Sequence, residues 1–165
     1  MPGFLTYPHA ALSRKAVARP VDAAMQAAGA ALLAAAQEVQ AYGLAAAHIG
    51  LDEPLVVIST SNDTTQRAYR VLYNPEIVGM ASQVEFGAEG SVSLPGIEVP
   101  VERATWVEIV HDNDDGGRET IRLEGFAARV AQHEIDQMNG MFFLHRVSRL
   151  KRDTAIRKFE KSRRG

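Results

Sequence analysis

The chain has 165 residues, 46% of them apolar and 23% charged, and a formal net charge of −2. This length suits one domain with a hydrophobic core, so we expect a single domain over residues 1–165, and the overall charge argues against a general nucleic-acid binder. The chain has no cysteine, which excludes disulfides and thiolate ligands. No apolar run approaches the roughly 18 residues that span a bilayer, and we expect a cytoplasmic protein.

The first predicted element is an alanine-rich helix over Val21–Tyr42, which Asp22 begins and Gly43 ends. Short β-branched or alternating runs then predict strands, with the last two forming a hairpin. These strands are Leu55–Ser59, Tyr69–Tyr73, Trp106–His111 and Glu119–Leu123.

Two more helices complete the prediction. Phe126–Met138 has a helical pattern and ends at an Asn-Gly pair, and an amphipathic helix follows from about Ser148 to Lys161.

The helix at Phe126–Met138 contains a motif typical of metal sites, with one departure. His133 is followed by Glu134, and residues four apart lie on one helical face, where a second histidine could hold the same metal ion. Gln137 stands in that second place. An amide oxygen is a much weaker ligand than imidazole for zinc or ferrous iron, so half of the helical metal site is missing.

Three segments together resemble the signature motifs of peptide deformylases, GxGLAAPQxG, EGCLS and QHExDH. They are Gly43–Gly50, Glu89–Ser93 and Gln132–Gln137, in the same order and spacing. The resemblance covers nearly the full length and implies an α+β fold, with antiparallel sheets around a central helix that carries the His-Glu motif, plus an N-terminal and a C-terminal helix. It also implies a bacterial protein of translation that acts on N-terminal formyl-methionine.

The family's mechanism, as the resemblance implies it, depends on a metal. One Cys and two His hold Fe(II) or a similar divalent ion, a bound water attacks the formyl carbon, and a Glu moves protons. A Gln of the first motif and a backbone N–H beside the Cys stabilise the oxyanion.

These roles transfer to this chain only in part. His133 matches the first His ligand and Glu134 the general acid/base. Ser91 occupies the Cys position, Gln137 the second His position, and His48 the position of the oxyanion-binding Gln. Arg103 also matches a family arginine, for which we expect a structural role.

A peptide-binding groove is expected to remain. In the family, the glycine that matches Gly43 offers backbone hydrogen bonds to the peptide, and we expect Gly43, Leu44, Gly90 and Val92 to bind an extended peptide or a small amide.

With two of three ligands replaced at the degenerate positions Ser91, His133 and Gln137, we expect no metal in the family's arrangement. The preferred interpretation is a peptide deformylase-like protein that is impaired or inactive in metal-dependent deformylation and is a candidate peptide-binding pseudoenzyme. Gln137 would then hydrogen-bond to His133 or to a water.

The alternative is an active deformylase or other amide hydrolase, in one of two forms. His48 and His133 could form a rebuilt site with Glu134 or Ser91 that holds Fe(II), Ni or Zn. Without a metal, Ser91 could act as nucleophile, with His48 or His133 as base and Glu134 orienting it.

Basic residues are concentrated at the end of the chain. The segment from Arg146 onward contains nine Lys and Arg but only two acidic residues, Asp153 and Glu160. Its formal net charge is therefore +7, and that of the remaining residues is −9. The tail could contact ribosomal RNA phosphates by charge, as the C-terminal helix of bacterial deformylases does, or form a solvated helix face.

Overall fold

A computed structural model describes residues 3–164, so the first two residues and the last residue of the expected 1–165 domain lie outside it. Within residues 3–164, no helix is long and apolar enough to cross a membrane. The helices are η1 (Ala10–Ser13), α1 (Ala23–Val39), η2 (Ala46–Ile49), α2 (Gly125–Met138), η3 (Phe143–Arg146) and α3 (Arg149–Arg164), where η denotes a 3₁₀ helix. The strands are β1 (Gly43–Ala45), β2 (Leu55–Ser59), β3 (Tyr69–Met80), β4 (Val84–Glu89), β5 (Val99–Ala104), β6 (Trp106–Asp112) and β7 (Arg118–Glu124).

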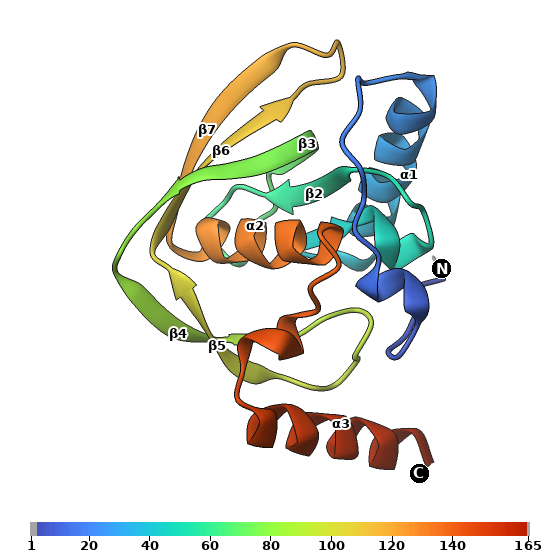
Figure 1. Cartoon of the computed structure of the whole chain (residues 1–165), viewed down its shortest axis with the longest axis vertical. Coiled ribbons are helices and arrows are strands. Elements are labelled where there is room, and N and C mark those ends of the chain that lie inside the picture. The colour runs from blue at the N-terminus through green and yellow to red at the C-terminus, as the bar shows by residue number, and fades with distance from the viewer. Residues whose placement is uncertain (1–2, 165) are drawn as a thin grey trace.

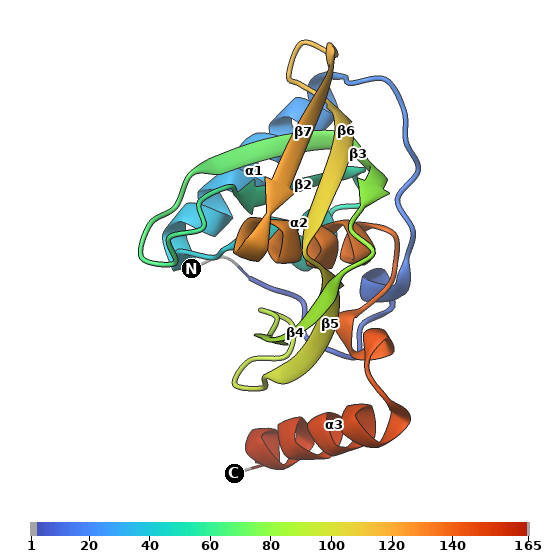
Figure 2. The same ribbon diagram turned by 90° about the vertical axis from the view of Figure 1, so that its left-hand side faces the viewer.

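The strands form two antiparallel sheets, which confirms the expected α+β class. Five strands lie in the order β1-β2-β3-β6-β7, and β4 pairs with β5 in a separate ribbon. Figures 1 and 2 show α2 between these two sheets, with α3 beyond the β4–β5 ribbon. The central helix is therefore α2, whose Arg129, His133 and Asp136 side chains contact residues of the smaller sheet.

Strand β2 is buried on both faces, which explains its continuous apolar sequence. Val56 and Ile58 pack in the cluster that includes α2, whereas Leu55 and Val57 pack in the cluster that includes α1. Successive side chains of a strand point to opposite faces, so α1 and α2 cover opposite sides of the sheet.

The start of α1 is fixed by a helix cap. The Asp22 carboxylate accepts a hydrogen bond from the Met25 N–H at 2.8 Å, so the helix begins at Ala23, two residues after Val21, the first residue of the predicted helix. The helix ends at Val39, where Gln40 adopts a left-handed conformation, three residues before the predicted end.

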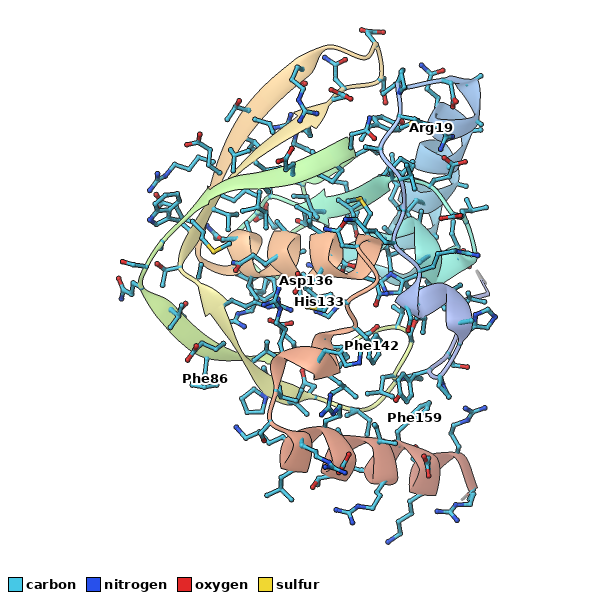
Figure 3. The ribbon with its side chains drawn as sticks, viewed as in Figure 1. Arg19, Phe86, His133, Asp136, Phe142 and Phe159 are labelled. Atoms are coloured by element: carbon cyan, nitrogen blue, oxygen red, sulfur yellow. The ribbon has the colours of Figure 1, made fainter. Side chains whose placement is uncertain are left out.

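A third apolar cluster joins the β4–β5 ribbon to the C-terminal segment. Phe142 and Phe143 pack with Val101 of β5, and Phe159 of α3 belongs to the same cluster. Figure 3 shows Phe159 on the side of α3 that faces the rest of the molecule. In α3, Ala155 and Phe159 are buried, and most of the other side chains are exposed.

Two sequence predictions about strands differ from the structure. The predicted strand Tyr69–Tyr73 was expected to stop at Asn74 and Pro75, but β3 continues to Met80. Asn74 has a φ of 48°, and the register to β6 shifts between Tyr73 and Glu76, so the chain passes the proline through a bulge. Strands β4 and β5 were not predicted, because their apolar alternation is interrupted by glycine, proline and charged residues.

A buried carboxylate connects the smaller sheet to α2. Glu89 accepts two hydrogen bonds from the Arg103 guanidinium, both at 2.9 Å, and one from Arg129 at 2.8 Å. The Nδ1 atom of His133 lies 2.8 Å from Oε1 of Glu89. Arg103 also donates to Asp136 at 2.6 Å, so the expected structural role of Arg103 consists of joining β4, β5 and α2.

This network keeps Glu89 ionised. Burial raises the pKa of Glu89, but the hydrogen bonds from Arg103 and His133 outweigh burial and lower the pKa to about 2. A buried ionised carboxylate is tolerated because each of its oxygens has charged or polar donors.

We expect Glu89→Gln to lower the free energy of unfolding by about 3 kcal/mol near neutral pH, because Arg103 and Arg129 lose their buried counter-charge. The folded-state pKa of Glu89 lies below the ordinary value of 4.5, so the stabilisation is complete above pH 4.5 and is lost as the pH falls toward 2. Denaturant unfolding of both proteins between pH 2 and pH 8 measures this difference.

Glu85→Gln is the matched control, since Glu85 lies on the same strand with an exposed side chain. It should change the unfolding free energy by less than about 0.5 kcal/mol. A gap between wild type and Glu89→Gln that stays constant across this pH range would contradict the assigned role of Glu89.

Candidate functional site

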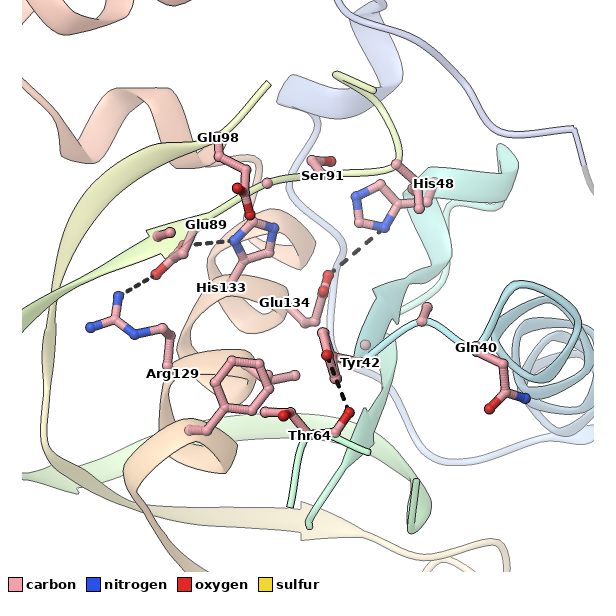
Figure 4. A pocket seen from close by; sticks show the side chains of 17 residues that line it. Gln40, Tyr42, His48, Thr64, Glu89, Ser91, Glu98, Arg129, His133 and Glu134 are labelled. Atoms are coloured by element: carbon pink, nitrogen blue, oxygen red, sulfur yellow. Dashed lines mark hydrogen bonds and ion pairs between the residues drawn. The ribbon is translucent and has the colours of Figure 1, made fainter. Parts of the chain in front are cut away.

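A pocket of about 510 Å³ lies where the three sequence motifs meet. The first motif contributes Gly43 and His48, the second Gly90, Ser91 and Val92, and the third His133 and Glu134. Figure 4 shows His48, Ser91, His133 and Glu134 around this space, on segments that are far apart in the sequence.

Two predicted site residues do not line the pocket. Leu44 is fully buried and packs in the apolar cluster of α1, so its side chain is a core residue. Gln137 is 1% exposed, and its Nε2 donates to the Leu12 carbonyl at 2.7 Å. The expected hydrogen bond from Gln137 to His133 is therefore replaced by a bond to the N-terminal segment.

His133 and Glu134 are neighbours in sequence but have different environments. Burial lowers the pKa of His133, but the carboxylates of Glu134 and Glu89 outweigh burial and raise it. Burial also raises the pKa of Glu134, to about 7. The Oε1 atom of Glu134 is buried without a hydrogen-bond partner among residues 3–164. Glu134 is thus a carboxyl group that can hold or release a proton near neutral pH.

His48 is held in one orientation by the backbone. The Ala45 N–H donates to its Nδ1 at 2.9 Å, which places the imidazole proton on Nε2. This Nε2 is buried and has no partner in the described part of the chain. Burial and the nearby His133 lower the pKa of His48 to about 3, so its 3.8 Å contact with Glu134 is not an ion pair.

Ser91 is not arranged as an activated nucleophile. Its Oγ accepts a hydrogen bond from the Ser93 N–H at 3.1 Å, and within residues 3–164 it makes none to His48 or His133. A serine nucleophile needs an adjacent base in hydrogen-bond contact, and this arrangement lacks one.

The residues present do not fit the three-ligand metal site of the family. Ser91 offers a hydroxyl in place of a thiolate, and Gln137 is bonded to Leu12 outside the pocket. His133 does fit, because its Nδ1 contacts the Glu89 carboxylate, as metal-bound histidines commonly do with one ring nitrogen. The described residues contain no group of three or more His, Asp or Glu placed to hold a metal ion. Of the three metal-coordinating atoms of the family site, this chain keeps the second ring nitrogen of His133, Nε2.

An open sheet edge forms one wall of the pocket. β1 is the outermost strand, and the Tyr42 carbonyl accepts from the Ser59 N–H of β2 at 2.7 Å. The backbone N–H and C=O groups of successive residues point to opposite sides of an antiparallel strand. Because Tyr42 bonds to β2, the backbone groups of Gly43 and Ala45 point away from β2, toward the open side. The hydrogen bond from the Ala45 N–H to His48 agrees with this direction.

Gly43 is also required sterically. A Cβ atom at this position would lie 2.9 Å from Cγ of Glu134 and 2.8 Å from a methyl group of Val130. The absence of a side chain therefore lets β1 approach α2 closely and brings the open edge beside Glu134.

Sequence reasoning missed several pocket residues, notably Arg129, Glu98, Tyr42 and Phe126. Arg129 precedes His133 by four residues, so helical periodicity could have placed it on the same face. Glu98 lies in a segment without predicted structure, and no sequence signal marked it.

Comparisons with known proteins agree with this geometry. The sequence profile of the Polypeptide deformylase family matches residues 1–153. A peptide deformylase-like protein of Agrobacterium fabrum is 39% identical over 162 residues, 96% of this chain and 95% of the relative. A peptide deformylase of the same strain is 36% identical over 122 residues, 74% and 72% of the two chains. The structure of Ehrlichia chaffeensis peptide deformylase in complex with actinonin superposes with a TM-score of 0.89 at 27% identity, covering 99% of this chain and 98% of that one.

The profile match spans most of the chain and the fold agrees along nearly its whole length. The chain belongs to the peptide deformylase family.

Proposed function

We propose that this protein binds extended peptide ends in its pocket and does not carry out efficient metal-dependent deformylation. The observation that carries the proposal is the state of the two replaced ligand positions. Ser91 bonds to its own loop and Gln137 to the Leu12 carbonyl, so neither side chain is free to coordinate an ion beside His133. No metal cofactor is proposed for the family site.

The peptide groove supports the binding part of the proposal. Gly43 offers one N–H and one C=O on the open edge of β1, and an extended chain can pair with them as an added strand. Gly90 and Val92 line the opposite part of the pocket. A pocket of about 510 Å³ is large enough for one or two side chains of a peptide or for a small amide.

The relatives support a separation of roles. Agrobacterium fabrum has one protein named peptide deformylase and another named peptide deformylase-like, and this chain aligns with both. It aligns with the deformylase-like protein over a larger share of its length. A strain with a separate deformylase leaves the deformylase-like protein free for another use of the groove.

The second candidate function is an amide hydrolase without the family metal. Glu134 favours it, because a buried carboxyl group with a pKa of about 7 is suited to general acid/base catalysis. Ser91 does not favour it, since its hydroxyl has no imidazole partner among the described residues. Binding without efficient turnover therefore remains the preferred proposal.

The direct test is deformylation of formyl-Met-Ala-Ser by protein purified anaerobically under reducing conditions. We expect turnover below about a thousandth of that of a complete peptide deformylase, because no metal-activated water is available. Elemental analysis of the same sample should find well below one equivalent of iron, nickel or zinc per chain. Robust turnover that is lost in Glu134→Ala would overturn the proposal in favour of the hydrolase.

The inherited geometry can be tested by restoring the ligands. Ser91→Cys combined with Gln137→His supplies a thiolate and a second imidazole one helical turn from His133, so we expect the double variant to bind close to one equivalent of zinc or nickel. The matched control is Ser91→Ala with Gln137→His, which lacks the thiolate and should bind the ion at least about tenfold more weakly. A folded double variant that binds no metal would show that these positions no longer converge.

We also propose that α3 contacts ribosomal RNA. The helix is held by Ala155 and Phe159, and its basic side chains are mostly exposed, as phosphate contacts require. The exposed cations are Arg149, Lys151, Arg157, Lys158, Lys161, Arg163 and Arg164.

Lys158→Glu combined with Lys161→Glu should reduce co-sedimentation with ribosomes, and the remaining binding should depend less steeply on salt, because phosphate contacts release counterions. Arg14→Glu with Lys15→Glu is the control, since it reverses two exposed charges near the N-terminus. Equal losses in both double variants would indicate a general charge effect and would contradict a specific role of α3.

A further inference from the structure

The cationic groups of the pocket wall are already committed to partners. Arg129 donates to Glu89 at 2.8 Å, to the Val101 carbonyl at 2.7 Å and to the Glu85 carbonyl at 2.9 Å. His133 uses Nδ1 for Glu89. These contacts commit both side chains to the ionised Glu89 carboxylate.

Glu134 has no such donor. Its side chain lines the pocket and is only 7% exposed, and Oε1 makes no hydrogen bond within residues 3–164. His48 cannot supply the missing charge, because its Nδ1 accepts from Ala45 and the ring is neutral. A buried carboxylate in this state favours a cationic donor supplied by a ligand.

A second carboxylate lines the same pocket from the other side. Glu98 lies just before β5, and its side chain is exposed and makes no ion pair with residues 3–164. Figure 4 shows Glu98 directed into the space in front of His133, while Glu134 faces that space from α2. The pocket therefore has two unpaired carboxylates on different elements.

We infer that the ligand is a peptide with a free, unformylated α-amino group. A primary ammonium carries a compact positive charge and three N–H donors, enough for Glu134 and Glu98 together. The Nε2–H of His48, which has no protein partner in the described chain, can donate to the carbonyl of the ligand's first residue. A formylated amine has no charge and one N–H, so it cannot satisfy both carboxylates.

This inference rests on the proposed peptide-binding function and reverses the formyl preference that the family resemblance implies. The ammonium group of the peptide lies beside Glu134, whose Oε1 has no hydrogen-bond partner among residues 3–164. The described part of this pocket has no set of side chains placed to hold a metal cation there. The ligand's own charge thus compensates Glu134.

Calorimetric titration with Met-Ala-Ser and formyl-Met-Ala-Ser tests the inference. We expect the free-amine peptide to bind about tenfold or more tightly than the formylated one, because a charge-assisted hydrogen bond to a buried group is lost on formylation. Glu134→Gln should reduce this ratio about tenfold, and Glu98→Gln about threefold, since Glu98 is exposed. Glu102→Gln, an exposed position on β5 outside the pocket, should leave the ratio unchanged.

Three other outcomes of these titrations would contradict the inference. Equal or tighter binding of the formylated peptide would overturn the inference and leave the peptide-binding proposal intact. Absence of binding by either peptide to the folded protein would overturn both. A formylated peptide with a lysine side chain that binds as tightly as Met-Ala-Ser would assign the carboxylates to a side-chain cation, and the α-amino assignment would fail.

Discussion

The buried carboxylate of Glu89 is the constraint on which the site depends. It accepts hydrogen bonds from Arg103, Arg129 and His133, which connect the β4–β5 ribbon to α2. Removing one partner of such a network leaves an uncompensated buried charge. The network therefore sets both the position of α2 and the orientation of the His133 ring.

This network contains no metal ligand other than His133, so the scaffold can persist when the other ligand positions change. Ser91 and Gln137 each have a protein partner, the Ser93 N–H and the Leu12 carbonyl respectively. The fold agrees with that of peptide deformylases, and the ion pairs of Glu89 with Arg103 and Arg129 lie beside the pocket.

The family resemblance predicted the fold class and the convergence of the three motifs, whereas the local hydrophobic pattern predicted only three helices and four strands. The sequence could not predict the direction of the Gln137 amide, because the Leu12 carbonyl comes from a segment 125 residues away. It also missed Glu98 and strands β4 and β5, where pairing between strands overrides weak local preference. The sequence also could not predict the orientation of the His48 ring, because that orientation depends on a hydrogen bond from the Ala45 N–H of an edge strand.

The unsatisfied atoms of the pocket point to a bound partner more strongly than its residue types do. Leaving Nε2 of His48 and Oε1 of Glu134 buried without partners costs on the order of 1–3 kcal/mol each. A ligand that accepts from the first atom and donates to the second recovers this free energy on binding. His48 also occupies the outward N–H of Ala45, which leaves Gly43 as the pairing position on β1 beside Glu134. One end of an extended peptide can satisfy all of these groups, whereas an apolar ligand would leave both atoms unpaired.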